Sequence, residues 1–317
     1  MSIISKISQH KVIVCAAILA FLMLTGTFFD FQIAQAVVNQ DAFFPAIVQI
    51  FFMIPYGLLL FLLAPIAAAF FIRMPFFNNV TKVAGVIACT IYGFAVVFVE
   101  AGQDLDEYYI IQKNLNSGKK IGFPSSNNDV AGNPLFTKTE QMTVTLIVFL
   151  LLAILSYIWL SRVSEKRLKQ LLIVALLGTA FALITETYLV DEFIKPLFGR
   201  ARPYQVFGGE FNGKDGIAYT PWWQINFFTG NKSFPSGHTA CFWTSAFFVY
   251  FVDPKNLLLR RVTIGLVILG GVFTALGRMV YGCHFLSDVT MSVIIVAGIA
   301  YLFGRILEAV ISSRTEA

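Results

Sequence analysis

The chain is poor in charged residues. Lysine, arginine, aspartate and glutamate make up only 13% of its 317 residues, whereas 57% are hydrophobic. A soluble globule of this size needs more polar surface than this composition supplies. The composition therefore excludes a soluble protein and indicates one that lies in a lipid bilayer.

Cysteine and histidine are also scarce, with four and three residues. Cys15, Cys89 and Cys241 lie in hydrophobic stretches and only Cys283 is close to a loop, so we expect no disulfide. Neither an HExxH zinc signature nor a phosphate-binding P-loop occurs in the sequence. The usual motifs for a metal or nucleotide site are therefore missing.

The net charge is +5, which in a soluble protein would suit nucleic-acid binding. Outside the segments described below, however, no basic run with interleaved aromatic residues is found. We therefore expect no nucleic-acid partner, and an anionic membrane partner or substrate explains the charge more simply.

Apolar stretches long enough to cross a bilayer recur along the chain, and a crossing takes about 20 residues. We predict an all-α integral membrane protein, a bundle of about eight transmembrane helices. The polar stretch 100–141 is predicted to be a long outward loop that forms a cap. The predicted spans are 12–29, 48–72, 83–99, 142–160, 171–190, 239–252, 262–276 and 287–304.

The first span follows Lys6 and Lys11 like a secretory signal, but no convincing cleavage site precedes Asp30, so we expect it to stay as an anchor. Basic residues between spans four and five, and between six and seven, predict that these connections are cytoplasmic. Eight spans then place both termini in the cytoplasm as well. These basic residues are Arg162, Lys166, Arg167, Lys169, Lys255, Arg260 and Arg261.

Two segments on the opposite, extracytoplasmic side are suited to an anion. Segment 195–203 follows span five and carries Lys195 and Arg202 seven residues apart. Segment 235–238 reads Pro-Ser-Gly-His at the start of span six, where free backbone N–H groups and the helix dipole attract negative charge.

A third segment, 278–288, leads from span seven into span eight and contains Arg278, His284 and Asp288. On a helix, the i to i+4 spacing would place His284 and Asp288 on the same face. A lone histidine at a helix end is usually a capping residue, but two histidines among several cations favour a catalytic site.

Together these motifs resemble the type 2 phosphatidic acid phosphatase (PAP2) superfamily, whose pattern is K-x6-R-P, P-S-G-H and S-R-x5-H-x3-D. Ten of its eleven named residues stand here at the required spacings, and Gly277 replaces the serine of the third motif. The motifs cover about 191–288. The resemblance implies a six-helix core within residues 83–317 and leaves 1–82 as an added two-helix transmembrane hairpin.

Phosphoryl transfer requires a nucleophile, stabilised equatorial oxygens and a proton for the leaving group. His284 is predicted to attack phosphorus, with Asp288 fixing its tautomer, and His238 to serve as general acid and then base. The resemblance implies the same roles and no metal or other cofactor. The predicted phosphate-binding groups are Lys195, Arg202, Arg278 and the backbone at Ser236 and Gly237.

These residues predict a metal-independent lipid phosphatase of the cell membrane that forms a phosphohistidine intermediate and acts on a terminal phosphate. Phosphatidate, phosphatidylglycerophosphate, isoprenyl diphosphate such as undecaprenyl diphosphate, and lipid A phosphate all present such a group. A lipid phosphotransferase of the same superfamily and a non-catalytic lipid-binding or transport protein stay open as alternatives. The sequence indicates no oligomeric state.

Several charged and aromatic residues near the motifs are interpreted as structural. Glu186 inside span five is expected to pair with a cation, because an ionised carboxylate at that depth costs roughly 2.5–3.5 kcal/mol. Arg200 and Lys232 are interpreted as headgroup anchors, and Trp222 and Trp223 as part of an aromatic belt. Asp191 and Glu192 are expected to pair with nearby lysine or arginine.

Overall fold

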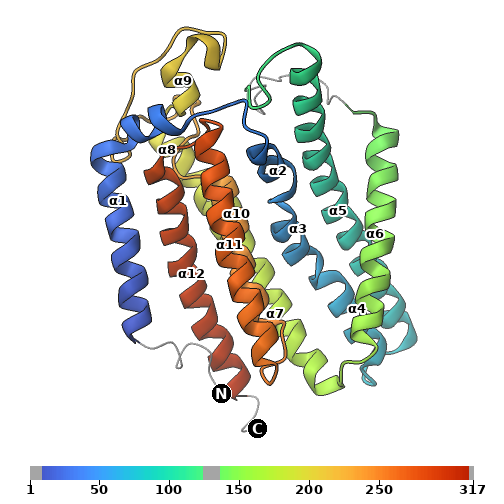
Figure 1. The fold of residues 1–317 in the computed structure, drawn as a ribbon. Coiled ribbons are helices and arrows are strands. Elements are labelled where there is room, and N and C mark those ends of the chain that lie inside the picture. Colours follow the sequence, from blue (N-terminus) through green and yellow to red (C-terminus); the bar gives the residue numbers. More distant parts are fainter. Residues whose placement is uncertain (1–8, 124–135, 314–317) are drawn as a thin grey trace.

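The structure is a computed structural model that describes residues 9–123 and 136–313. Within these residues it is an all-helical bundle without strands (Figure 1). Seven helices or runs of helices in this part of the chain are long and apolar enough to cross a membrane. The prediction of an all-α, multi-span integral membrane protein is confirmed.

The first crossing is one continuous helix, whereas the second crossing, Phe44–Arg73, is a helix with two breaks. It consists of three short helices that meet at Phe52–Met53 and Leu62, and Pro55 stands in the first turn after the first break. Proline lacks an N–H and clashes with the preceding turn, so it belongs at such helix starts. The helices of the two crossings are α1 (Gln9–Val37), α2 (Phe44–Phe51), α3 (Ile54–Phe61) and α4 (Leu63–Arg73).

The third crossing, α5 (Asn79–Asn116), is much longer than the predicted span. Its 38 residues extend about 57 Å, nearly twice a 30 Å hydrocarbon layer. The prediction of a loop from residue 100 was therefore wrong, because the polar residues 100–116 continue the helix. Residues 124–135 of the predicted loop lie outside the described residues. α6 (Lys138–Leu160) follows and begins with a Thr137–Glu140 capping box.

The second half of the chain begins with a run of helices, Glu165–Phe207, that contains a π-helix. A π-helix is a rare form that is found mostly at functional sites. The sixth predicted span corresponds to α10 followed by the 3-10 helix η4. These two helices have fourteen residues together and are only about 24 Å long. The elements are α7 (Glu165–Ala182), π-helix η2 (Leu183–Ile194), α8 (Lys195–Phe198), α9 (Pro203–Phe207), η3 (Gly209–Phe211), α10 (Gly237–Thr244), η4 (Ser245–Tyr250), α11 (Leu257–Val280) and α12 (Leu286–Ser313).

Short α10 lies inside the bundle, in contact with α3, η2, α11 and α12. The first two crossings pack on different partners: α1 lies against α12, whereas α2 contacts α5 and α11, and α4 contacts α5 and α7 (Figure 1). α1 begins and α12 ends at the same end of the bundle, and α8 and α9 lie at the opposite end (Figure 1). The division of the chain at residue 82 stays a prediction.

Candidate active site

A cavity of about 550 Å³ lies where η2, α10 and α11 meet the α5 helix. All three sequence motifs contribute to its lining, so the structure brings together most of the residues that the sequence singled out. Ser236 and Asp288, in contrast, are fully buried and do not line the cavity. The predicted residues that line it are Lys195, Arg202, Gly237, His238, Arg278 and His284.

Lys195 reaches the cavity from the first turn of α8, where it is 7% exposed. Its ammonium group pairs with the carboxylate of Asp191, one turn earlier, which confirms the partner expected for that acid. The same ammonium lies against α10, because a Cβ added to Gly237 would come within 2.5 Å of Lys195 Nζ. Because glycine has no side chain, residue 237 leaves space for the Lys195 ammonium beside the start of α10.

The chain turns sharply after α8 and returns towards α11. Gly199 ends α8 with a φ of 51°, a left-handed conformation that glycine adopts without strain. Beyond the extended Arg202, the backbone N–H of Tyr204 donates to the carbonyl of Gly282 at 3.0 Å. This bond holds the first motif against the turn that carries the third.

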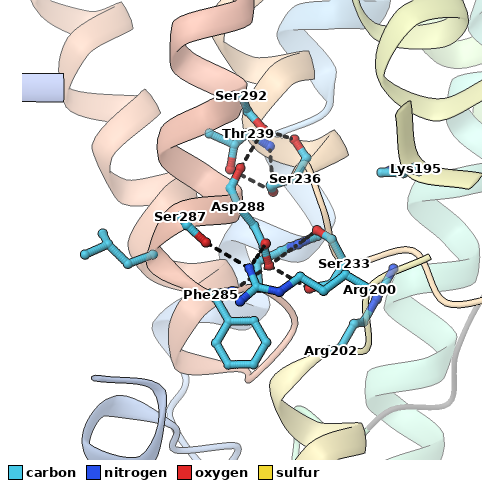
Figure 2. Close-up of polar contacts among 12 residues, drawn as sticks. Lys195, Arg200, Arg202, Ser233, Ser236, Thr239, Phe285, Ser287, Asp288 and Ser292 are labelled. Atoms are coloured by element: carbon cyan, nitrogen blue, oxygen red, sulfur yellow. Dashed lines mark hydrogen bonds and ion pairs between the residues drawn. The ribbon is translucent and has the colours of Figure 1, made fainter. Parts of the chain in front are cut away.

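Ser236 organises the start of α10. Its Oγ accepts hydrogen bonds from the backbone N–H of Thr239 at 3.4 Å and from the Thr239 hydroxyl at 2.9 Å. Its own N–H donates to the carbonyl of Asp288 at 3.2 Å (Figure 2). That N–H is therefore committed within the protein, which corrects the expectation that it binds phosphate. Gly237 is the residue of the pair that lines the cavity.

His284 lies in the turn before α12, so it does not share a helix face with Asp288 as predicted. Its Nδ1 is 2.7 Å from the carbonyl oxygen of Ser233 and 3.7 Å from Asp288 Oδ2. A carbonyl only accepts, so Nδ1 carries the hydrogen and Nε2 keeps its lone pair. The carbonyl of Ser233, rather than Asp288, makes the direct bond that fixes the tautomer.

The pKa of His284 is held well below its ordinary value. Burial is the main cause, and the nearby cations Arg202, Arg278 and Lys195 lower the pKa further. The imidazole is therefore neutral at neutral pH. A neutral ring with a free Nε2 is the form that can act as a nucleophile.

Asp288 is instead the centre of a buried network around Arg200 (Figure 2). Arg200 Nη1 donates to Asp288 Oδ1 at 2.5 Å, and the Ser233 hydroxyl donates to Oδ2 at 2.6 Å. The backbone N–H of Phe285 donates to the same Oδ2 at 2.8 Å, which caps the start of α12. Asp288 thus holds the Ser233 side chain and the Phe285 backbone, and both residues lie next to His284.

The network extends to α1 through Asp30. Arg200 Nη2 donates to Asp30 Oδ2 at 3.0 Å, and the backbone N–H of Ser287 donates to Asp30 Oδ1 at 2.9 Å. Gly26, one turn earlier, allows this contact, since a Cβ there would lie 2.9 Å from Ser287 N. The prediction of Arg200 as a headgroup anchor was wrong, because its side chain is 1% exposed and sits between two carboxylates.

Arg278 is a buried cation whose hydrogen bonds are incomplete. The residue is 3% exposed and lines the cavity, and its Nε and Nη1 have no hydrogen-bond partner among the described residues. An unpaired buried guanidinium is costly, so such a group usually awaits an anion. This feature favours an anion-binding cavity.

Glu186 and Trp222 are both interpreted from the sequence as structural residues. Glu186 is buried and lines the cavity, where it accepts a 3.3 Å hydrogen bond from Thr187 Oγ1 and interacts electrostatically with Lys195. Trp222 donates from Nε1 to Thr27 Oγ1 at 2.9 Å and stacks on Phe234. Trp222 therefore ties the loop before α10 to α1.

Packing explains why residue 277 is a glycine and not the serine of the family pattern. A Cβ at this position would lie 2.9 Å from Val48 Cβ and 2.8 Å from its Cγ2. Real Cβ atoms essentially never come so close to other heavy atoms. The close approach of α2 to α11 therefore excludes the serine that the pattern expects.

The fold and the cavity define the class: an integral membrane protein of helices with histidines and cations gathered at one end of the bundle. Residues 171–311 match the model of the PAP2 superfamily, so this part of the chain belongs to that superfamily. The match contains all three motifs. No curated protein and no solved structure matches the chain significantly.

Proposed function

We propose that the protein is a membrane lipid phosphatase that releases a terminal phosphate through a phosphohistidine intermediate. The observation that carries the proposal is the state of His284, a buried neutral imidazole whose Nδ1–H is bound to the Ser233 carbonyl and whose ring lines a cationic cavity. Superfamily membership supports a phosphatase reaction in general. The lipid substrate and the histidine mechanism are the finer parts of the proposal.

In the first step, Nε2 of His284 forms a bond to phosphorus as the bond from phosphorus to the lipid oxygen breaks. The imidazole becomes a cation, which Asp288 at 3.7 Å and the Ser233 carbonyl at 2.7 Å stabilise. His238 takes up a proton when the anionic phosphate binds beside it and gives that proton to the departing oxygen. The products are the dephosphorylated lipid and phosphohistidine.

In the second step, water attacks the phosphohistidine. His238, now neutral, takes a proton from that water, and the bond between phosphorus and Nε2 breaks to return neutral His284. Arg278, Arg202 and Lys195 balance the charge on the phosphoryl oxygens in both steps. Arg278 is the cation best placed for this, since its Nε and Nη1 have no hydrogen-bond acceptor in the part of the chain that the structure describes.

The test is phosphate release by the detergent-purified protein from a panel of lipid monophosphates and diphosphates, with EDTA present. Wild type should release phosphate, and His284→Ala should be at least about 10³-fold slower because the nucleophile is gone. His238→Ala should keep residual activity towards a good leaving group such as p-nitrophenol, which needs no acid. Isoprenyl diphosphate is the first substrate to try, as the site is proposed to face outward.

His10→Ala is the matched control, because His10 lies on α1 far from the motifs and is exposed. Equal rates for wild type and His284→Ala would remove the nucleophile from the mechanism. Transfer of phosphate to an added acceptor lipid, without free phosphate, would identify a phosphotransferase. Loss of activity in EDTA would require a metal.

A further inference from the structure

The cavity is lined by four cationic and five acidic side chains. The proposed reaction uses the cations and leaves the carboxylates without a role. Negative charges beside a phosphate site weaken phosphate binding. A pocket for phosphate alone would therefore bind it better without them.

Three of these carboxylates lie on one face of α5. Glu100, Asp104 and Glu107 are spaced i, i+4 and i+7, and all three line the cavity. A hydrocarbon layer takes up about 20 helical residues, so the helix from Asn79 passes through it before Glu100. The acidic face thus stands at the depth of lipid head groups, at the end of the bundle that carries α9 (Figure 1).

Among the described residues, no cation neutralises Glu100 or Asp104 on this face. The charged groups that act on Glu100 are Asp104 and Glu186, and the one that acts on Asp104 is Glu107, so all are acidic. Among the described residues, neither Glu100 nor Asp104 lies within 4 Å of a cation. Asp191, in contrast, is paired with Lys195.

A second, independent feature also points to a ligand. Tyr281 is 3% exposed and lines the cavity, yet its hydroxyl has no hydrogen-bond partner among the described residues. Burial raises the pKa of Tyr281, and its hydroxyl interacts electrostatically with Arg278 and Glu107. Tyr281 therefore stands between the basic and the acidic parts of the cavity, where a ligand that spans both would meet it.

We infer that the cavity binds a lipid phosphate whose head group also carries a primary ammonium. The phosphate lies among Lys195, Arg202 and Arg278, and the ammonium lies against Glu100 and Asp104. An ammonium offers three hydrogen-bond donors, which two carboxylates and a tyrosine hydroxyl can accept. This inference rests on the proposed function and narrows its substrate to amine-bearing lipid phosphates.

The test uses probes that cannot be hydrolysed, so binding is measured apart from turnover. Isothermal titration calorimetry compares ω-aminoalkylphosphonates of two to eight methylenes with alkylphosphonates of equal length. At one or two adjacent lengths, the amine should raise the affinity of the wild type at least about tenfold. Asp104→Asn should remove that gain while it leaves the affinity for the plain alkylphosphonate unchanged or higher.

Asp106→Asn is the matched control, because it makes the same change two residues along α5 at a position that does not line the cavity. It should keep the gain. An amine that adds nothing at any length, or a gain that survives Asp104→Asn and Glu100→Gln, would overturn the inference. So would Mg²⁺ raising the affinity for the plain alkylphosphonate in the wild type but not in Asp104→Asn.

The two proposals fail in different ways. Release of phosphate from phosphatidate, which has no amine, together with no effect of the amine, would leave the phosphatase and refute the substrate class. No binding of any phosphonate and no phosphate release would refute both.

Discussion

Replacing Arg200 by methionine removes the cation that lies between the buried carboxylates of Asp30 and Asp288. The side chains of Arg200, Asp30 and Asp288 are at most 1% exposed. Methionine has nearly the volume of the arginine stem, so the change tests charge more than packing. Asp30 and Asp288 would then face each other without a counter-ion, away from water.

The expected loss of stability follows from that burial. Removal of one partner from a buried ion pair costs about 3–5 kcal/mol, because the remaining charge is left uncompensated. At roughly 2–4 °C per kcal/mol, the midpoint of thermal unfolding should fall on the order of 10 °C. Activity should fall as well, because Asp288 holds Ser233 and Phe285, the residues next to His284.

The assay is thermal unfolding of the detergent-purified variants, followed by tryptophan fluorescence. Arg261→Met is the matched control, since Arg261 is exposed at the start of α11, at the other end of the bundle. Its midpoint should stay within about 2 °C of the wild type. A double variant, Arg200→Met with Asp30→Asn, should regain at least about 1 kcal/mol by removing one of the two repelling carboxylates.

The reasoning fails if Arg200→Met unfolds at the same temperature as Arg261→Met. It also fails if the double variant is as unstable as the sum of its single changes, because the two side chains would then not interact. Either result would mean that the buried network does not hold α1 to the start of α12.

Three smaller predictions follow. Gly237→Ala should displace the ammonium of Lys195 and lower kcat/KM about 10–100-fold with unfolding unchanged; wild-type kinetics would contradict the packing. Nitrogen NMR of histidine-labelled protein should show His284 neutral well below pH 6.5, its ordinary pKa, because burial and cations oppose protonation; protonation near 6.5 would refute this. Thr27→Val leaves the Trp222 N–H unpaired and should cost about 1 kcal/mol; an unchanged midpoint would dismiss the contact.

The general fold could be predicted because hydropathy and motif spacing are local signals. Span positions follow from apolar runs, and the motifs mark the ends of helices that meet at one end of the bundle. The length of α5 could not be predicted this way. Glu100 and Asp104 are typical of a loop by composition, and only the cavity they face explains why they continue a helix.

The supporting residues of the site were missed for a related reason. A single arginine near a membrane boundary, such as Arg200, is usually an anchor, and its two carboxylate partners come from α1 and α12. Asp30 did carry a signal, since an acidic residue in an apolar helix is a functional candidate by itself. Nothing local in the sequence shows that Ser233 supplies the carbonyl that binds His284.

The bond between Asp30 and Ser287 joins positions 257 residues apart, which has a consequence for biosynthesis. At about 5–20 residues per second, the ribosome needs roughly 10–50 s to make the intervening chain. Asp30 therefore enters the membrane long before its partners exist, and the network closes only when the last helix has been inserted. A chain released before α12 would hold the helices that line the cavity and still lack a working site, so the protein becomes active only when its synthesis is complete.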